Sequence, residues 1–168
     1  DRQWKTVLTA LAVVLLFQAI PQLRQRENGL YYLLMAVTLC FVTDVAAYLI
    51  GSRFGKHKLI PDVSPKKTIE GSVAGIICCT LVILGYAFVC SRVWGVQCNY
   101  AILAALGVLL SIVGQIGDLA MSVIKREYNI KDYGKIMPGH GGALDRFDSV
   151  LAVAIVLAAA EIFVDVFA

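Results

Sequence analysis

Five long apolar runs, separated by short polar segments, dominate the 168-residue chain. A helix needs roughly 20 apolar residues to cross a bilayer core of about 30 Å, and each run reaches or approaches that length. Because an open sheet edge finds no hydrogen-bond partners in lipid, the pattern predicts an all-α fold, a polytopic transmembrane helical bundle of about five spanning helices. The runs cover residues 6–20, 30–50, 72–90, 100–124 and 149–168.

The composition supports a membrane protein and excludes other classes. Hydrophobic residues make up 59% of the chain and charged residues 16%, whereas soluble domains are typically about 45–50% apolar and about 25% charged. The net charge of +3 is too small to favour a nucleic-acid partner. No internal repeat or low-complexity linker divides the sequence, so residues 1–168 are predicted to form a single transmembrane domain.

The basic residues are unevenly distributed between the connecting segments. Five spans place the N-terminus and the segments 51–71 and 125–148 on one side of the membrane, where they carry 12 of the 15 Lys and Arg residues. The positive-inside rule assigns that side to the cytoplasm. The sequence therefore predicts an integral, multi-pass protein whose polar segments 51–71 and 125–148 face the cytoplasm.

Asp44 and Asp118 lie within predicted spans, where a charge costs about 2.5–3.5 kcal/mol on insertion scales. Such residues normally face a bundle interior or a water-filled cavity, which makes both candidates for a functional site. Helical spacing puts Ser122, Lys125 and Arg126 on the same face as Asp118. The structural alternative is that Asp44 pairs with a nearby lysine, and that the basic residues only complement a helix C-terminus.

The polar stretch KDYGKIMPGHGGALDRFDS fills residues 131–149 between two apolar runs. PGHGG excludes a regular helix, and a glycine-rich turn lets backbone N–H groups approach an anion closely. A helix is predicted to begin near Leu144, with Asp145 and Asp148 on one face, where two carboxylates can share a divalent cation. The alternative is that these acids only complement the dipole of a first helical turn. His140 is interpreted as a hydrogen-bonding loop residue rather than a catalytic base.

The segment SPKKTIEG at residues 64–71 is a further polar element. Ser64 is predicted to cap a helix, with Pro65 at its first position. Lys66 and Lys67 then stand at a helix N-terminus, where cations are disfavoured unless an anion is bound, so the pattern indicates phosphate binding. The alternative is that both lysines snorkel at the membrane interface.

Carboxylates, basic residues and a glycine-rich turn together suit phosphoryl or nucleotidyl transfer. These reactions need positioning and charge stabilisation, usually through Mg²⁺ that bridges carboxylates and substrate phosphates. A different interpretation is an ion or proton transporter in which Asp44, Asp118, Lys125 and Glu161 form a relay. A relay needs charged sites that reach both membrane faces, and the one-sided basic cluster argues against it.

The run SVIKREYNIKDYGKIMPGHGGALDRFD at residues 122–148 closely resembles the signature of the phosphatidate cytidylyltransferases, also called CDP-diacylglycerol synthases. DVAAYLIGSRFGKHKL at residues 44–59 and the segment SPKKTIEG are also similar to that family. The resemblance implies that CTP and phosphatidic acid are converted to CDP-diacylglycerol and pyrophosphate, with Mg²⁺ as cofactor and a second cation left open. It also implies a homodimer in a lipid bilayer, with the bacterial inner membrane as the expected location, and that this chain is the C-terminal portion of a longer one.

The resemblance further implies roles for individual residues. Asp118, Asp145 and Asp148 match acidic positions that bind metal and take part in catalysis, and Lys125 is expected to be catalytic with them. The basic positions suited to the CTP triphosphate and the lipid phosphate are matched by Lys66, Lys67, Lys125, Arg126, Lys131 and Lys135, and which lysine serves which substrate is left open. From its predicted place at the membrane surface, Lys67 is expected to contact the lipid phosphate. The residues expected to bind the two substrates are Asp44, Ser64, Lys66, Lys67, Ser122, Arg126, Lys131, Asp132, His140, Gly141, Gly142 and Arg146.

A CTP-dependent membrane lipid kinase is the second alternative, because it would use the same cations and lysines. The reaction products separate the three interpretations. Pyrophosphate marks nucleotidyl transfer, CDP marks a kinase, and neither marks a transporter.

Overall fold

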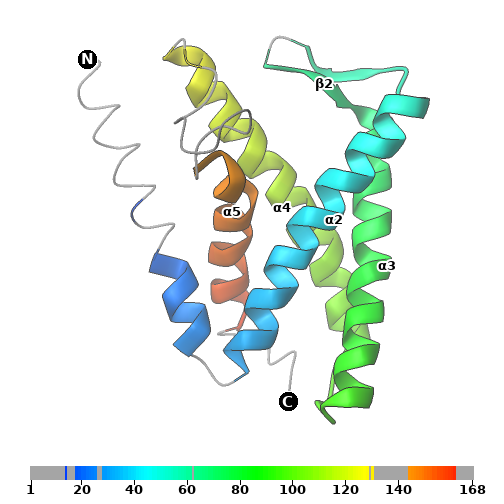
Figure 1. Ribbon diagram of the computed structural model, residues 1–168, viewed down its shortest axis with the longest axis vertical. Coiled ribbons are helices and arrows are strands. Elements are labelled where there is room, and N and C mark those ends of the chain that lie inside the picture. Colours follow the sequence, from blue (N-terminus) through cyan, green and yellow to red (C-terminus); the bar gives the residue numbers. More distant parts are fainter. Residues whose placement is uncertain are drawn as a thin grey trace.

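The computed structural model describes residues 14, 18–25, 28–61, 63–128, 130 and 144–161. Within these ranges, long helices form a bundle, and a two-stranded hairpin connects two of them at one end (Figure 1). A short helical segment covers residues 18–25. The long elements are α2 (Gly29–Phe54), β1 (Lys58–Ile60), β2 (Ser64–Thr68), α3 (Ile69–Val93), α4 (Tyr100–Glu127) and α5 (Leu144–Glu161).

The helices enclose one continuous apolar core. α2 contacts α3, α4 and α5, and α4 also packs against both α3 and α5. Tyr32, Leu39, Ile83, Leu110 and Val153 are fully buried where these helices meet. The hairpin, the C-terminal end of α4 and the N-terminal end of α5 lie at the same end of the bundle (Figure 1).

Three of the predicted spans correspond to helices that are long and apolar enough to cross a membrane. These helices are α2, α3 and α4, and they contain the predicted runs 30–50, 72–90 and 100–124. Large apolar side chains such as Phe41 and Leu81 are exposed on the outside of the bundle, as expected for helices that face lipid. The all-α transmembrane fold is therefore confirmed for the described helices.

The first and last predicted spans lie partly outside the described residues. Only residues 14 and 18–20 of the first run are described. The last run appears as a shorter apolar helix at Ser149–Ala160 within α5, and the part of it beyond residue 161 lies outside the described residues.

Glycines allow α2 and α3 to approach closely. A Cβ atom on Gly71 would lie 2.5 Å from the carbonyl oxygen of Ala47, and one on Gly75 would lie 3.0 Å from the carbonyl oxygen of Thr43. Gly71 and Gly75 have the GxxxG spacing that lets helix backbones pack together in membranes. This contact fixes α3, and the strand that precedes it, against α2.

The hairpin shows that the helix predicted at residues 64–71 was placed too early. Ser64–Thr68 form strand β2, which pairs antiparallel with β1, so Ser64 does not cap a helix. Thr68 caps α3 instead, and its hydroxyl oxygen accepts a hydrogen bond from Gly71 N at 3.2 Å. The physical reason is that threonine caps a helix as serine does, while Pro65 favours an extended residue before it.

The hairpin is also the exception to the predicted all-helical chain. It follows the last turn of α2 and precedes the first turn of α3, at the end of the bundle (Figure 1). The unpaired backbone N–H and C=O groups at its strand edges therefore do not need hydrogen-bond partners within the apolar length of the helices.

Candidate functional site

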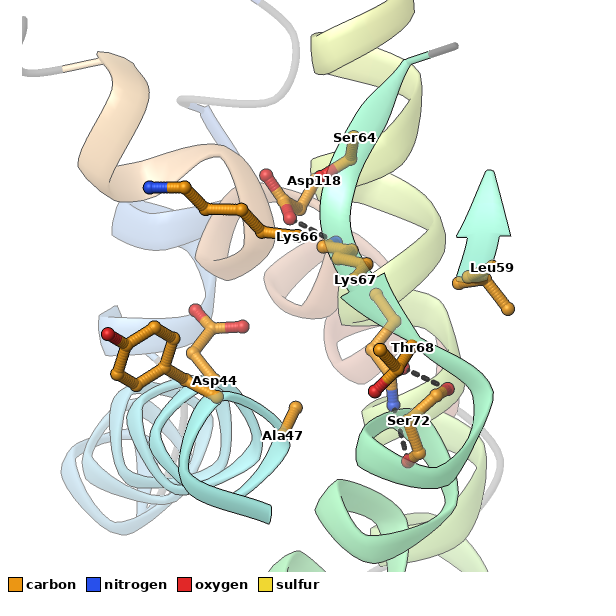
Figure 2. A pocket seen from close by; sticks show the side chains of 11 residues that line it. Asp44, Ala47, Leu59, Ser64, Lys66, Lys67, Thr68, Ser72 and Asp118 are labelled. Carbon is orange, nitrogen blue, oxygen red and sulfur yellow. Dashed lines mark hydrogen bonds and ion pairs between the residues drawn. The ribbon is translucent and has the colours of Figure 1, made fainter. Parts of the chain in front are cut away.

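A cavity of about 260 Å³ lies between α2, the hairpin, α3 and α4. Figure 2 shows Asp44 entering it from α2, while Lys67 of β2 and Asp118 of α4 meet across from it. The charged residues of the lining are Asp44, Lys66, Lys67 and Asp118, and the polar ones include Ser64, Thr68, Ser72 and Gln115. The cavity thus collects acids and bases from three separate elements of an otherwise apolar bundle.

Lys67 and Asp118 form an ion pair between β2 and α4. The Lys67 and Asp118 side chains are 26% and 25% exposed, and the Nζ atom of Lys67 is itself buried. Apart from the Asp118 carboxylate, no described residue offers Nζ an acceptor. Because an ammonium group carries three donors, the Lys67 ammonium has unused hydrogen-bonding capacity beside the cavity.

The strand separates the two lysines that precede α3. Consecutive residues of a strand point to opposite faces. Figure 2 shows Lys67 directed toward Asp118 and Lys66 directed away from it. Lys66 is exposed, and within the described part of the chain it forms no ion pair. Lys67 is therefore held against an acid, whereas Lys66, which also lines the cavity, is not.

A second polar contact joins α3 to α4 beside the cavity. The Ser72 hydroxyl donates to the side-chain oxygen of Gln115, and Gln115 Nε2 donates to the carbonyl oxygen of Ser72 at 3.4 Å. Gln115 and Asp118 are three residues apart and share one face of α4. The contact ties the first turns of α3 to the part of α4 that carries Asp118.

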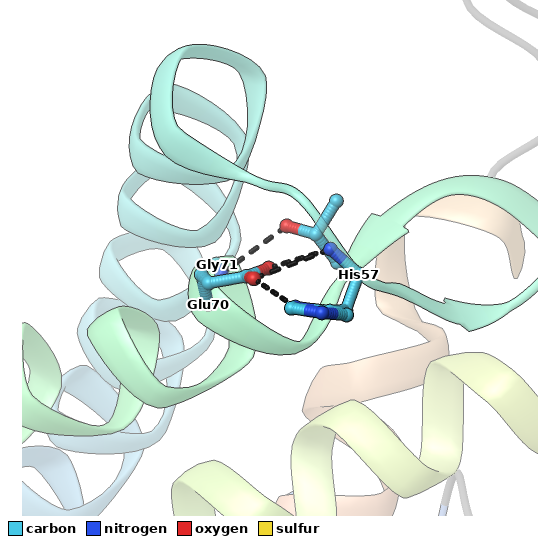
Figure 3. A network of polar contacts seen from close by, with 4 residues as sticks. His57, Glu70 and Gly71 are labelled. Atoms are coloured by element: carbon cyan, nitrogen blue, oxygen red, sulfur yellow. Dashed lines mark hydrogen bonds and ion pairs between the residues drawn. The ribbon is translucent and has the colours of Figure 1, made fainter.

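A polar clasp closes the base of the hairpin (Figure 3). The carboxylate of Glu70 accepts hydrogen bonds from His57 N at 3.2 and 3.3 Å, and Glu70 Oε1 lies 2.7 Å from His57 Nδ1. Ile69 N donates to the carbonyl oxygen of His57 at 3.0 Å. The residue before β1 is therefore held on the first turn of α3, which fixes both ends of the hairpin that presents Lys66 and Lys67.

The structure brings several predicted site residues together around the cavity. These residues are Asp44, Ser64, Lys66, Lys67 and Asp118. The alternative in which Asp44 pairs with a lysine is not realised among the described residues, because Lys67 pairs with Asp118. Ser64 lines the cavity from β2 rather than from a helix cap.

The remaining basic residues of α4 lie beyond this cavity. Ser122, Lys125 and Arg126 follow Asp118 toward the end of the helix and are absent from the cavity lining. Arg126 Nε instead donates to the carbonyl oxygen of Val63 at 3.5 Å. Arg126 thus joins the end of α4 to the turn of the hairpin.

The predicted residues Lys131, Asp132, His140, Gly141 and Gly142 lie outside the described residues. The backbone of Asp145, Arg146 and Asp148 is described, and it forms the first turns of α5, as the predicted helix start near Leu144 requires. The side chains of these three residues are not among those described.

The register of α4 against α5 places the acidic positions at a similar level. A Cβ atom on Gly114 would lie 3.3 Å from the Val153 side chain and 3.9 Å from that of Ser149. The two helices run in opposite directions (Figure 1). One further turn along each helix from this contact leads to Asp118 on α4 and to Asp145 on α5.

Sequence reasoning missed several residues that shape the site. Gln115 is a neutral polar residue within a predicted span, three residues before Asp118, and that spacing is the signal that identifies it. The clasp between Glu70 and His57 has no such local signal. Glu70 fits a first helical turn on its own, and its contact with His57 depends on the hairpin.

The described cavity residues supply some of the oxygen ligands that a hard cation needs, but not a complete set. Asp44 and Asp118 offer carboxylate oxygens, which Mg²⁺ prefers, and the Lys67 ammonium already places a positive charge against Asp118. Among the described residues, no group of three or more His, Cys, Asp or Glu side chains is placed to hold a metal ion. A complete metal site therefore needs further donors, and Asp145 and Asp148 occupy the adjoining start of α5.

Comparison with known proteins defines the class of this fold and site. A sequence model of the Cytidylyltransferase family matches residues 1–163, so the chain belongs to the cytidylyltransferase family.

Curated relatives give a narrower similarity. Proteins named phosphatidate cytidylyltransferase from Staphylococcus aureus (strain COL) and Staphylococcus haemolyticus (strain JCSC1435) are each 45% identical to this chain over 128 residues. One of the same name from Staphylococcus epidermidis (strain ATCC 12228 / FDA PCI 1200) is 46% identical over 128 residues. Each alignment covers 76% of this chain and 48% of the relative, so the chain spans about half the length of the curated relatives it matches.

Proposed function

We propose that the chain forms the catalytic part of a CTP:phosphatidate cytidylyltransferase, which makes CDP-diacylglycerol and pyrophosphate from CTP and phosphatidic acid. The observation that carries the proposal is the cavity in which Lys67 and Asp118 meet across from Asp44. The names of the relatives that are about 45% identical support the choice of substrates.

In the proposed reaction, an oxygen of the lipid phosphate attacks the α-phosphorus of CTP. A new P–O bond forms, the bond from the α-phosphorus to the bridging oxygen breaks, and pyrophosphate leaves with that oxygen. Both substrates are anionic, so positive charge is needed where they meet. Lys66 and Lys67 on the hairpin, with Lys125 and Arg126 at the end of α4, are described residues that can supply that charge.

We also propose that Asp118, Asp145 and Asp148 hold Mg²⁺. When bound, this ion would neutralise part of the charge on the CTP phosphates. The donor chemistry of Asp118 and the level of Asp145 on α5 support this set. The same proposal includes a second bound cation. It also includes the binding of CTP or lipid by the other residues that the sequence predicted for the site.

The proposed enzyme is an integral protein of the bacterial inner membrane, acts as a homodimer, and has its site on the cytoplasmic side. The orientation rests on the 12 of 15 basic residues that share one side with the hairpin. With the native cysteines replaced, Lys56→Cys should resist an impermeant thiol reagent in intact cells, whereas Gln97→Cys should be labelled. Both positions are exposed. Efficient labelling at position 56 alone would reverse the orientation.

Product analysis tests the reaction itself. Full-length protein in detergent or liposomes is incubated with CTP and phosphatidic acid, with and without Mg²⁺. We expect CDP-diacylglycerol and pyrophosphate in equal amounts, and no product without the metal. Release of CDP with a phosphorylated lipid would establish a kinase instead, and the absence of any nucleotide product would contradict both enzyme interpretations.

A further inference from the structure

We propose that the Lys67 ammonium and a divalent cation compete for the carboxylate of Asp118, and that breaking the ion pair makes the ammonium available to a phosphate oxygen of a substrate. The inference rests on the proposed function. It concerns which charge neutralises Asp118 before and after the substrates bind.

The first observation is that the ion pair occupies the cavity wall itself. Lys67 and Asp118 both line the cavity, and both side chains are about three-quarters buried. A carboxylate in such a place needs a positive neighbour, because burial without one is costly. Lys67 meets this need in the absence of any other cation.

The second observation is the unused hydrogen-bonding capacity of the ammonium. The Nζ atom of Lys67 is buried, and beyond the Asp118 carboxylate no described residue gives it an acceptor. The carboxylate does not use all three N–H donors of the ammonium, and buried donors are normally paired. A phosphate group, with several anionic oxygens, would supply the acceptors that the protein does not.

Coulomb repulsion makes the two cations alternatives rather than partners. A divalent ion bound to Asp118 would lie within a few ångströms of the Lys67 ammonium, where like charges repel strongly in a partly buried site. The flexible four-carbon stem of lysine lets the ammonium move while its backbone stays in place. β2 is held by its pairing with β1 and by the clasp between His57 and Glu70, so movement is confined to the side chain.

Direct measurement of metal binding tests the competition. Mn²⁺ is titrated into full-length protein in detergent without CTP or lipid, and bound Mn²⁺ is followed by electron paramagnetic resonance. Lys67→Met is compared with Lys66→Met, which removes the same charge from the same cavity but leaves the ion pair intact. We expect Lys67→Met to bind Mn²⁺ about 10-fold more tightly than Lys66→Met, the factor that corresponds to one charge-assisted contact. If the two variants bind Mn²⁺ with equal affinity, Lys67 and the metal ion do not compete for Asp118.

Asp118→Asn separates this inference from the proposed metal site. The variant should bind Mn²⁺ weakly, and adding Lys67→Met to it should give no gain. If Asp118→Asn binds Mn²⁺ as wild type does, Asp118 is not a ligand, and both the proposed metal site and the competition are wrong. If it loses binding while Lys67→Met and Lys66→Met behave alike, the metal site stands and the competition alone is wrong. Lys67→Gln and Lys66→Gln replace the methionine pair if Lys67→Met does not yield monodisperse protein.

Steady-state kinetics at saturating Mg²⁺ test the transfer of the ammonium to phosphate. A contact made in both the ground and transition states raises KM more than it lowers kcat. We expect Lys67→Met to raise KM about 10-fold beyond the change in Lys66→Met, for one substrate. A rise for phosphatidic acid identifies the lipid phosphate as the acceptor, and a rise for CTP identifies the nucleotide. If KM rises for neither substrate, the Lys67 ammonium does not bind a substrate phosphate, and this part of the proposal is wrong.

Discussion

Asp118→Asn should lower the turnover of CTP and phosphatidic acid by at least about 100-fold, a typical loss when one electrostatic contact to a reacting group is removed. The substitution keeps the shape of the side chain and removes its charge. The asparagine oxygen can still face Lys67, so the bundle should remain folded. The measurement is the rate of CDP-diacylglycerol formation at saturating Mg²⁺, with the elution profile in detergent as the test of folding.

Glu127→Gln is the matched control for this substitution. Glu127 also lies on α4, but it is exposed at the end of the helix and does not line the cavity. Its loss of charge should leave turnover near that of wild type. Near-normal turnover of Asp118→Asn at saturating Mg²⁺ would remove Asp118 from the proposed catalytic centre.

Gly71→Val should strongly destabilise the protein and abolish activity with it. The added side chain meets the backbone carbonyl of Ala47, and a Cβ atom there would lie only 2.5 Å from that oxygen. A backbone group cannot rotate away as a side chain does, so α3 must separate from α2. Overpacking of this kind costs roughly 1–3 kcal/mol or more. The yield of monodisperse protein and the temperature of half-inactivation in detergent measure the effect.

Gly85→Val provides the same change in the same helix without the close contact. Apart from its chain neighbours and the nearby backbone of α3 itself, no described atom lies within 4 Å of a Cβ built on Gly85. This variant should retain the yield and inactivation temperature of wild type, because valine there extends outward from the bundle. Similar losses in the two variants would show that α3 cannot tolerate valine for a reason other than its approach to α2.

The helices were predictable because each one corresponds to a single long, continuous apolar run in the sequence. The runs that became α2, α3 and α4 are apolar over enough residues to span a bilayer whichever face they present. Asp44 and Asp118 were equally visible, since a charge within such a run is costly and needs a polar surrounding. Both residues do line the cavity.

The hairpin was not predictable in the same way because it depends on pairing between separate segments. Serine followed by proline in SPKKTIEG is typical of a helix start, and nothing in that segment shows that residues 58–60 lie beside it. The strands are short and their register shifts between Lys58 and Ile60, so no alternating pattern reveals them. The partner of Lys67 depends on this pairing, which is why its contact with Asp118 could not be inferred from spacing.

The clasp between His57 and Glu70 has a consequence for conformational entropy. It holds the chain at the start of the hairpin, while α3 holds the end, so the segment that presents Lys67 is a short closed loop. Ordering a free loop around a ligand opposes binding, because every residue fixed loses backbone freedom. Here that loss occurs when the protein folds. The free energy of contact between Lys67 and an anion is therefore not reduced by the cost of ordering the strand that carries it.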